Sequence, residues 1–110
     1  MKIAYKIWLD NDGKAFGEGP YRLLKLIEKT GSINRAAAEM EMSYRKAWKI
    51  LKMVEEKLGF ELIERKIGGA DGGGSQITER GKEIMKNYGR FREETKTLLE
   101  KLFNKYFGNY

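Results

Sequence analysis

The sequence contains no cysteine and no histidine among its 110 residues. Disulfides, thiolate or imidazole metal ligands, cysteine nucleophiles and histidine general bases are therefore excluded. Carboxylates offer no convincing alternative, because the adjacent pairs Glu55-Glu56 and Glu93-Glu94 diverge by about 100° on a helix. We expect no enzyme, no metal site and no cofactor.

Long apolar runs are also missing, and none approaches the roughly 20 residues that span a bilayer. No basic segment followed by an apolar stretch opens the chain, so no signal peptide is expected. We expect a cytoplasmic protein with no membrane partner. The 110 residues, of which 41% are hydrophobic, suffice for one domain with a modest core.

The sequence has fewer acidic residues than basic ones. The 22 Lys and Arg outnumber the 16 Asp and Glu, which gives a formal net charge of +6 and a pI near 9.5. This excess favours a polyanionic partner, either nucleic acid or an anionic membrane surface.

Residues 2–16 carry the pattern of a β-hairpin. Residues 2–10 are rich in β-forming side chains and alternate in part, and Asn11-Asp12-Gly13 is a strong turn signal. Residues 14–16 would form the returning strand.

Three helices are expected next. The first begins near Pro20, a residue suited to the first helical turn, and ends at Gly31. Ser32 is a good N-cap for a second helix that runs to about Met40. Ser43 caps the third, which covers residues 44–58 and ends at Gly59.

The remaining chain reads as a β-ribbon followed by one long helix. Residues 60–67 form a strand, residues 68–75 a glycine-rich loop, and residues 76–77 the start of the return. The loop lacks the Lys-Ser or Lys-Thr of a nucleotide-binding P-loop, so a wing is the better interpretation. Thr78 caps a helix that reaches Phe107, about 45 Å long.

The order helix, helix, short turn, helix and ribbon predicts a winged helix-turn-helix. The fold class is α+β and mainly α, with an N-terminal β-hairpin, a glycine-rich wing and a long C-terminal helix. Residues 1–78 are assigned to a DNA-binding domain and residues 79–110 to a dimerisation helix in the same compact unit.

The third helix carries cations through its first three turns, with no acid among them. Such a helix can enter the major groove of DNA and hold phosphates on both sides.

Tyr44 suits a sugar, phosphate or thymine-methyl contact. Trp48 could pack between helices or contact a base. Asp71 disfavours contact of the wing tip with DNA. The predicted DNA-binding residues are Arg35, Ser43, Tyr44, Arg45, Lys46, Lys49, Lys52, Arg65 and Lys66.

The last helix carries an apolar stripe with alternating spacings of four and three, which is the periodicity of a coiled coil. The stripe could pack only on its own domain, but one short domain cannot easily cover a 45 Å helix. A homodimer is therefore expected. The predicted interface residues are Ile84, Tyr88, Phe91, Leu98, Leu102 and Tyr106, with Thr95 a polar interruption.

Two segments carry a specific resemblance. Residues 31–51, GSINRAAAEMEMSYRKAWKIL, and residues 64–78, ERKIGGADGGGSQIT, resemble the helix-turn-helix and wing of the molybdate-responsive ModE regulators. The sharpest matches are Ser43-Tyr44, Ala47-Trp48 and Gly72-Gly73-Gly74. The stretch LGFELIER at residues 58–65 is also similar to the related LysR-type regulators.

The resemblance implies a homodimeric, double-stranded DNA-binding domain whose third helix reads the sequence. We therefore expect a sequence-specific transcription regulator. ModE regulators usually carry C-terminal oxyanion-binding domains, whereas this sequence ends at Tyr110. We expect no molybdate-binding domain and no small-molecule effector. Two alternatives stay open: a winged-helix module for protein assembly, and a regulator that senses an oxyanion within this domain.

Overall fold

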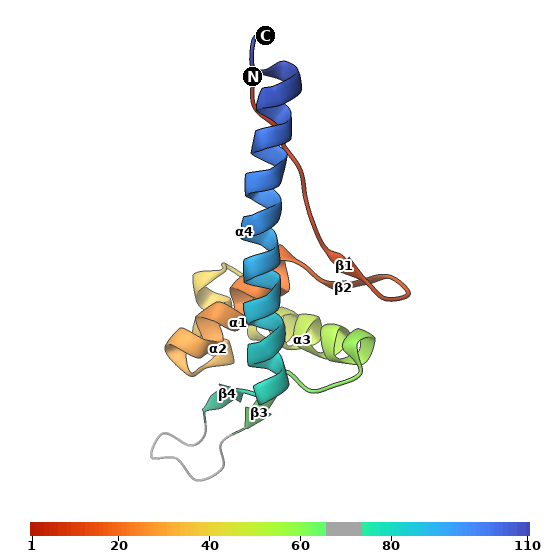
Figure 1. Cartoon of the computed structure of the whole chain (residues 1–110). Helices are drawn as coiled ribbons and strands as arrows, with labels where there is room; N and C mark the ends of the chain where they lie inside the picture. The colour runs from red at the N-terminus through yellow and green to blue at the C-terminus, as the bar shows by residue number, and fades with distance from the viewer. Residues whose placement is uncertain (66–73) are drawn as a thin grey trace.

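The computed structural model describes residues 1–65 and 74–110 of the chain, apart from the side chain of Arg65. Figure 1 shows the shorter helices gathered around one end of a long helix, whose other end extends beyond them. The elements are β1 (Leu9–Asp10), β2 (Lys14–Phe16), α1 (Glu18–Thr30), α2 (Ile33–Glu39), α3 (Tyr44–Leu58), β3 (Ile63–Arg65), β4 (Ser75–Ile77) and α4 (Glu79–Phe107). The expected mainly helical, winged α+β fold is confirmed.

Side-chain caps and glycines set the helix boundaries. The hydroxyls of Ser32, Ser43 and Thr78 each accept a hydrogen bond from the amide three residues later, at 2.9 to 3.1 Å. Gly31 and Gly59 end α1 and α3 in the left-handed conformation, with φ of 71° and 83°. All five positions are those expected from the sequence, because caps and left-handed termini depend on local chemistry.

The helix-turn-helix depends on small residues in α2. Ala36 and Ala37 are at most 1% exposed, so the α2 backbone lies close to its neighbours. The turn between α2 and α3 passes through Glu41, which has a φ of 57°. The amide of Met42 donates to the carbonyl of Ala37 at 3.0 Å and holds the turn.

One hydrophobic core includes residues of the helices and residues in or next to both described strands of the wing. Leu23, Leu24 and Ile27 of α1 are completely buried, as is Leu62, which precedes β3. The amide of Ser75 donates to the carbonyl of Gly31 at 2.9 Å. The base of the wing is therefore fixed to the end of α1.

The N-terminal hairpin is shorter than expected. β1 and β2 pair Leu9 with Phe16, and residues 1–8 form no strand. The return strand ends at Phe16 because α1 begins at Glu18, which leaves no backbone to pair with residues 1–8. This N-terminal segment instead runs beside α4 (Figure 1).

The first wing strand begins later than expected, at Ile63 and not at residue 60, and the return strand begins at Ser75, one residue before the expected position. β3 and β4 are antiparallel, and their register pairs Ile63 with Ile77 and Arg65 with Ser75. Lys66 and Asp71, which the sequence analysis singled out, lie outside the described residues.

Candidate nucleic-acid interface

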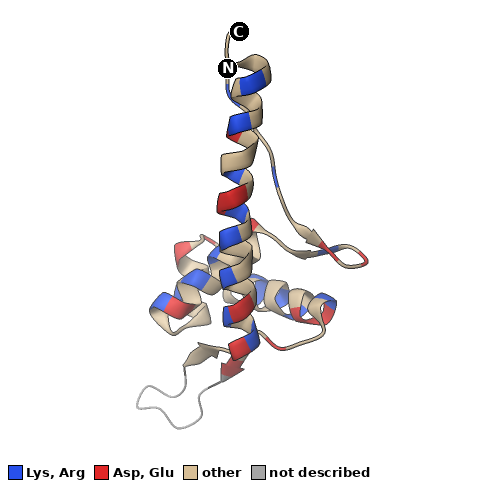
Figure 2. Ribbon diagram, viewed as in Figure 1, with Lys and Arg blue, Asp and Glu red and all other residues tan. Residues whose placement is uncertain are grey.

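Helix α3 has one face in the core and one face in solvent. Ala47, Leu51 and Val54 are at most 5% exposed and pack against the other helices. Figure 2 marks in blue the Lys and Arg positions along the ribbon of the helix. The exposed cations of α3 that the sequence analysis proposed for DNA are Arg45, Lys46, Lys49 and Lys52. The structure therefore brings these four together on one helix surface.

The start of α3 combines a cap with two exposed aromatic rings. Ser43 uses its hydroxyl oxygen as acceptor for the amide of Lys46 at 3.1 Å. Tyr44 is 42% exposed and Trp48 is 43% exposed. Of the two interpretations of Trp48, the structure therefore favours the solvent face over packing between helices.

Among the described residues, Lys52 is the one member of this cationic group that forms an ion pair with an acid. Its Nζ lies 3.1 Å from Oε1 of Glu55. The other carboxylate oxygen of Glu55 accepts from the amide of Leu62 at 2.7 Å and from that of Ile63 at 3.4 Å. Glu55 thus ties the helix to the strand of the wing.

Sequence reasoning missed the role of Glu55, which it considered only as one of two adjacent carboxylates that diverge on a helix. No local signal identifies this role, because it requires the end of α3 and the chain entering β3 to approach each other. The Glu55 side chain is only 10% exposed. A carboxylate with so little exposure needs partners, and the two amides and one ammonium supply them.

The remaining predicted contacts lie on other elements. Arg35 is an exposed residue in the first turn of α2. Arg65 is the last residue of β3, at the base of the wing. The exposed Arg35 thus lies on the helix that packs directly against α3.

The described residues contain no cluster of three acidic residues that could hold a metal ion. None of their buried side-chain nitrogen or oxygen atoms lacks a hydrogen-bond partner. No described helix is long and apolar enough to cross a membrane.

The apolar stripe of α4 divides into two parts. Tyr88 is 2% exposed, and its ring centroid lies 5.2 Å from that of Phe16 and 5.1 Å from that of Tyr21. Ile84 is partly buried against the same core. These two predicted interface residues therefore pack within their own chain, because the first half of α4 covers α1 and β2.

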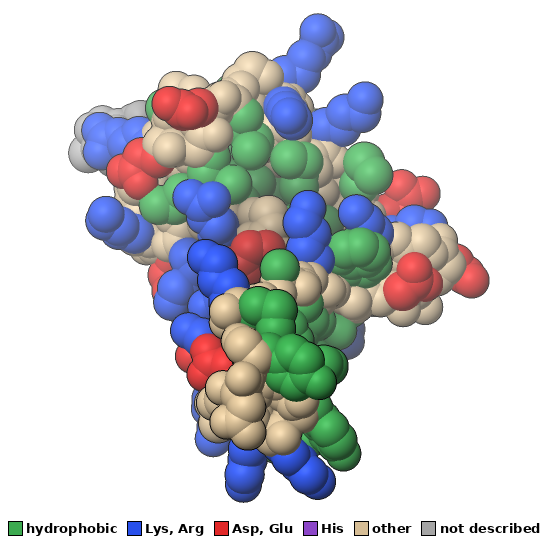
Figure 3. Space-filling model, turned by 90° about the horizontal axis from the view of Figure 1, so that it is seen from above, with side chains coloured by type: hydrophobic (Ala, Val, Ile, Leu, Met, Phe, Trp, Pro, Cys, Tyr) green, Lys and Arg blue, Asp and Glu red, His purple; other side chains and the backbone are tan. Residues whose placement is uncertain are grey.

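Beyond that point the stripe is in solvent. Phe91, Leu98, Leu102 and Tyr106 are 50% to 61% exposed. Seen from above, hydrophobic side chains gather on one side of the projecting end of the molecule and cations on the other (Figure 3). The second half of α4 is thus amphipathic, with an apolar stripe that is about half exposed.

Residues 21–82 match the family described as bacterial regulatory helix-turn-helix protein, lysR family. The chain is 38% identical over 95 residues to the molybdenum transport protein ModE of Azotobacter vinelandii, covering 86% of this chain and 35% of that protein. It is 35% identical over 66 residues to the DNA-binding transcriptional dual regulator ModE of Escherichia coli, covering 60% of this chain and 25% of that protein. The chain thus spans about a quarter to a third of the length of these relatives.

A solved structure supports the fold. A LysR family transcriptional regulator superposes with a TM-score of 0.59 over 79% of this chain and 28% of that one, at 13% identity. Together the matches cover the helix-turn-helix and the described parts of the wing.

Proposed function

The chain belongs to the LysR-type family of bacterial regulatory helix-turn-helix proteins, and from this premise we propose that it is a sequence-specific, double-stranded DNA-binding transcription regulator of the ModE type. The observation that carries the proposal is the exposed cationic face of α3, opposite a face buried in the core. Such a helix fits the major groove and neutralises phosphates on either side. We infer a cytoplasmic location, because a bacterial transcription regulator must reach the DNA.

Arg45 and Lys49 are the proposed base-reading residues. They lie four residues apart, so their side chains leave the same side of α3. Ser43, Tyr44, Lys46 and Lys52 lie along the same groove. Arg35, Arg65 and Lys66 contact phosphates from α2 and the base of the wing. Phosphate contacts fix the register of the protein on DNA, and base contacts select the sequence.

We further propose that residues 1–78 form the DNA-binding domain and that residues 79–110 pair it with a second copy. The exposed part of the α4 stripe supports this arrangement, since Phe91, Leu98, Leu102 and Tyr106 are large apolar side chains that stay at least half exposed. A homodimer presents two α3 helices to successive major grooves, so its site is a palindrome with half-sites about one helical turn apart.

The test is selection of bound duplexes from a random pool, followed by competition between the selected duplex and a scrambled one. Arg45→Ala and Lys49→Ala should each weaken selected-site binding by about 1–3 kcal/mol and relax one base position. Lys101→Ala, on the exposed second half of α4, is the matched control and should change neither affinity nor preference.

Equal losses on both duplexes would show that Arg45 and Lys49 contact only phosphates. Absence of any binding to duplex DNA at low salt would overturn the proposal and leave the protein-assembly alternative.

A further inference from the structure

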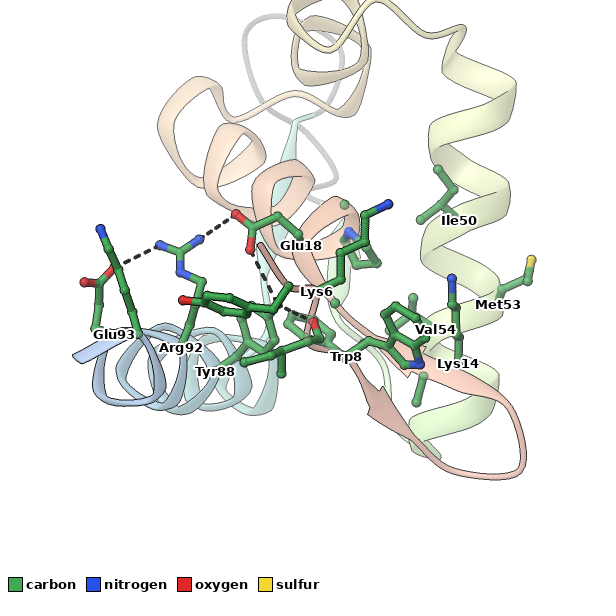
Figure 4. A pocket seen from close by; sticks show the side chains of 18 residues that line it. Lys6, Trp8, Lys14, Glu18, Ile50, Met53, Val54, Tyr88, Arg92 and Glu93 are labelled. Carbon is green, nitrogen blue, oxygen red and sulfur yellow. Dashed lines mark hydrogen bonds and ion pairs between the residues drawn. The ribbon is translucent and has the colours of Figure 1, made fainter. Parts of the chain in front are cut away.

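A cavity of about 710 Å³ lies beside α3, on the side away from the wing. Four parts of the chain enclose it: the N-terminal segment, β2 with the start of α1, the C-terminal half of α3, and the middle of α4 (Figure 4). Its volume lies in the range of roughly 300–1,000 Å³ that is typical of small-molecule sites.

The cavity has an apolar interior and an apolar rim. Phe16 and Val54 lie at its buried side and are at most 5% exposed. Tyr5, Trp8 and Met53 also line it but are 40%, 44% and 56% exposed. Large apolar side chains left in solvent around a concave surface are typical of a binding site.

Two hydrogen bonds between segments that are far apart in the sequence hold the walls of the cavity in place. The hydroxyl of Tyr88 donates to the carbonyl of Ile7 at 3.0 Å, which anchors the N-terminal segment to α4. The side-chain amide of Asn11 donates to the carbonyl of Lys57 at 2.7 Å, which anchors the hairpin to α3. The cavity is therefore preformed, as most ligand sites are.

Cations dominate the charged lining. Arg92 is neutralised, because it pairs with Glu18 at 2.6 Å and with Glu93 at 3.6 Å. The other three lining cations, Lys6, Lys14 and Lys96, form no ion pair with any described carboxylate. Figure 4 shows Lys6 and Lys14 extending into the space between the N-terminal segment and α3.

An aromatic platform lies next to one of these ammonium groups. Nζ of Lys14 is 4.1 Å from the ring centroid of Trp8. The ammonium lies over one face of the ring, so the pair presents an aromatic surface and a cation at the same place. This pairing selects a ligand with a flat apolar body and a negative group.

We propose that this cavity binds a small aromatic organic anion, such as an aryl carboxylate or sulfonate. A small anion fits the site better than a second copy of the chain, because the lining cations Lys6, Lys14 and Lys96 form no ion pair with any described carboxylate. Arg92 and Lys96 also lie to one side of the α4 stripe, since Arg92 is about 100° around the helix from Phe91. The proposal does not depend on DNA binding.

The test uses 8-anilinonaphthalene-1-sulfonate, whose fluorescence rises in apolar surroundings, and the full chain. We expect saturable binding of one probe per chain. Lys6→Gln combined with Lys14→Gln should weaken it about 5- to 20-fold, from the usual size of partly exposed ion pairs. Met53→Glu, which places a carboxylate at the mouth, should weaken it by at least as much.

Three controls separate this site from other apolar surface. Lys101→Gln, a cation on α4 outside the cavity, and Leu98→Ser, on the α4 stripe, should leave the affinity within twofold. The uncharged N-phenyl-1-naphthylamine should bind the double lysine variant as it binds the parent chain.

Equal probe affinity in the parent chain and the double lysine variant would overturn the proposal, as would loss of binding in Leu98→Ser. A fall in probe binding as the chain associates at higher concentration would show that a second copy covers the cavity, and would also overturn it.

Discussion

Glu55 shows how one side chain can set the position of α3, the helix that we propose reads DNA, relative to the wing. Its carboxylate accepts from the amides of Leu62 and Ile63 and pairs with Lys52. Charge-assisted hydrogen bonds to backbone amides are stronger than neutral ones. We therefore expect Glu55→Gln to lower the free energy of unfolding by about 1–2 kcal/mol.

Urea unfolding of this variant beside Glu56→Gln measures the effect. Glu56 is the adjacent residue but is exposed, so its variant should differ from the parent by less than about 0.5 kcal/mol. Equal stability of the two variants would contradict the assigned role of Glu55.

Tyr88 should make the stability of the fold depend on pH in the alkaline range. Burial raises its pKa above the ordinary value of 10.0, and the neighbouring Glu18 carboxylate raises it further. The folded pKa exceeds the unfolded one, so this stabilising contribution is complete below about pH 10 and disappears as the pH rises through the folded pKa.

Absorbance at 295 nm should accordingly show one of the six tyrosines ionising later than the rest. Tyr88→Phe should remove that late step. It should also cost about 0.5–1.5 kcal/mol at neutral pH, because the carbonyl of Ile7 loses its donor. A titration identical in parent and variant would refute the assignment.

At the scale of elements, α4 can lie against the wing only because Gly81 lacks a side chain. A Cβ there would lie 2.9 Å from the carbonyl oxygen of Leu62 and 2.8 Å from Cγ2 of Ile77. Gly81→Ala should therefore destabilise the fold by about 1–2 kcal/mol, despite the helix propensity of Ala.

Gly19→Ala is the matched control in thermal or urea unfolding. Gly19 also lies in a helix, but a Cβ there meets no atom within 4 Å. We expect that variant to be neutral or slightly more stable. A stable Gly81→Ala would mean that α4 can shift away from β3 without cost.

The exposed half of α4 carries the prediction of a dimer. Leu98→Asp with Leu102→Asp would place carboxylates in the apolar seam between two helices, at a cost of several kcal/mol. Sedimentation should show a monomer, and a palindromic site should bind more weakly because its half-sites are no longer linked. Lys96→Asp with Lys101→Asp, a charge change beside the stripe, should leave the dimer largely intact.

An unchanged dimer in the leucine variant would remove the second half of α4 from the interface. Folding of that variant is checked by circular dichroism, and both leucines are at least half exposed, so the monomer should keep its fold.

The elements that the sequence predicted best are those set by local chemistry. Ser32, Ser43 and Thr78 cap the three helices expected of them, because a cap depends on a few neighbouring residues. Tertiary contacts decided the rest. The spacing of Tyr88 in the sequence predicts a place in the interface stripe of α4. The side chain is buried instead, because Phe16 and Tyr21, which are distant in the sequence, pack against its ring.

At the scale of the whole molecule, the shape separates the surface proposed to bind DNA from the surface proposed to pair two copies. The chain extends over about 59 × 27 × 21 Å, and the described N-terminal segment lies beside the projecting part of α4 (Figure 1). The compact end carries α3 and the base of the wing, and the projecting end carries the exposed apolar stripe. Pairing through that stripe would leave both α3 helices free to meet DNA.

The charge of the whole molecule leads to the last prediction, that DNA affinity falls steeply with salt. If a dimer neutralises about 8 phosphates, log K should fall against log salt with a slope near −7, because each contact releases condensed counterions. Lys46→Ala, on the exposed face of α3, should reduce the magnitude of that slope by about 2 in a dimer, one unit for each copy. Lys101→Ala should leave the slope unchanged. Titrations of a labelled duplex between about 50 and 200 mM salt measure both slopes, and a flat salt dependence of the parent chain would rule out α3 as the phosphate-binding surface.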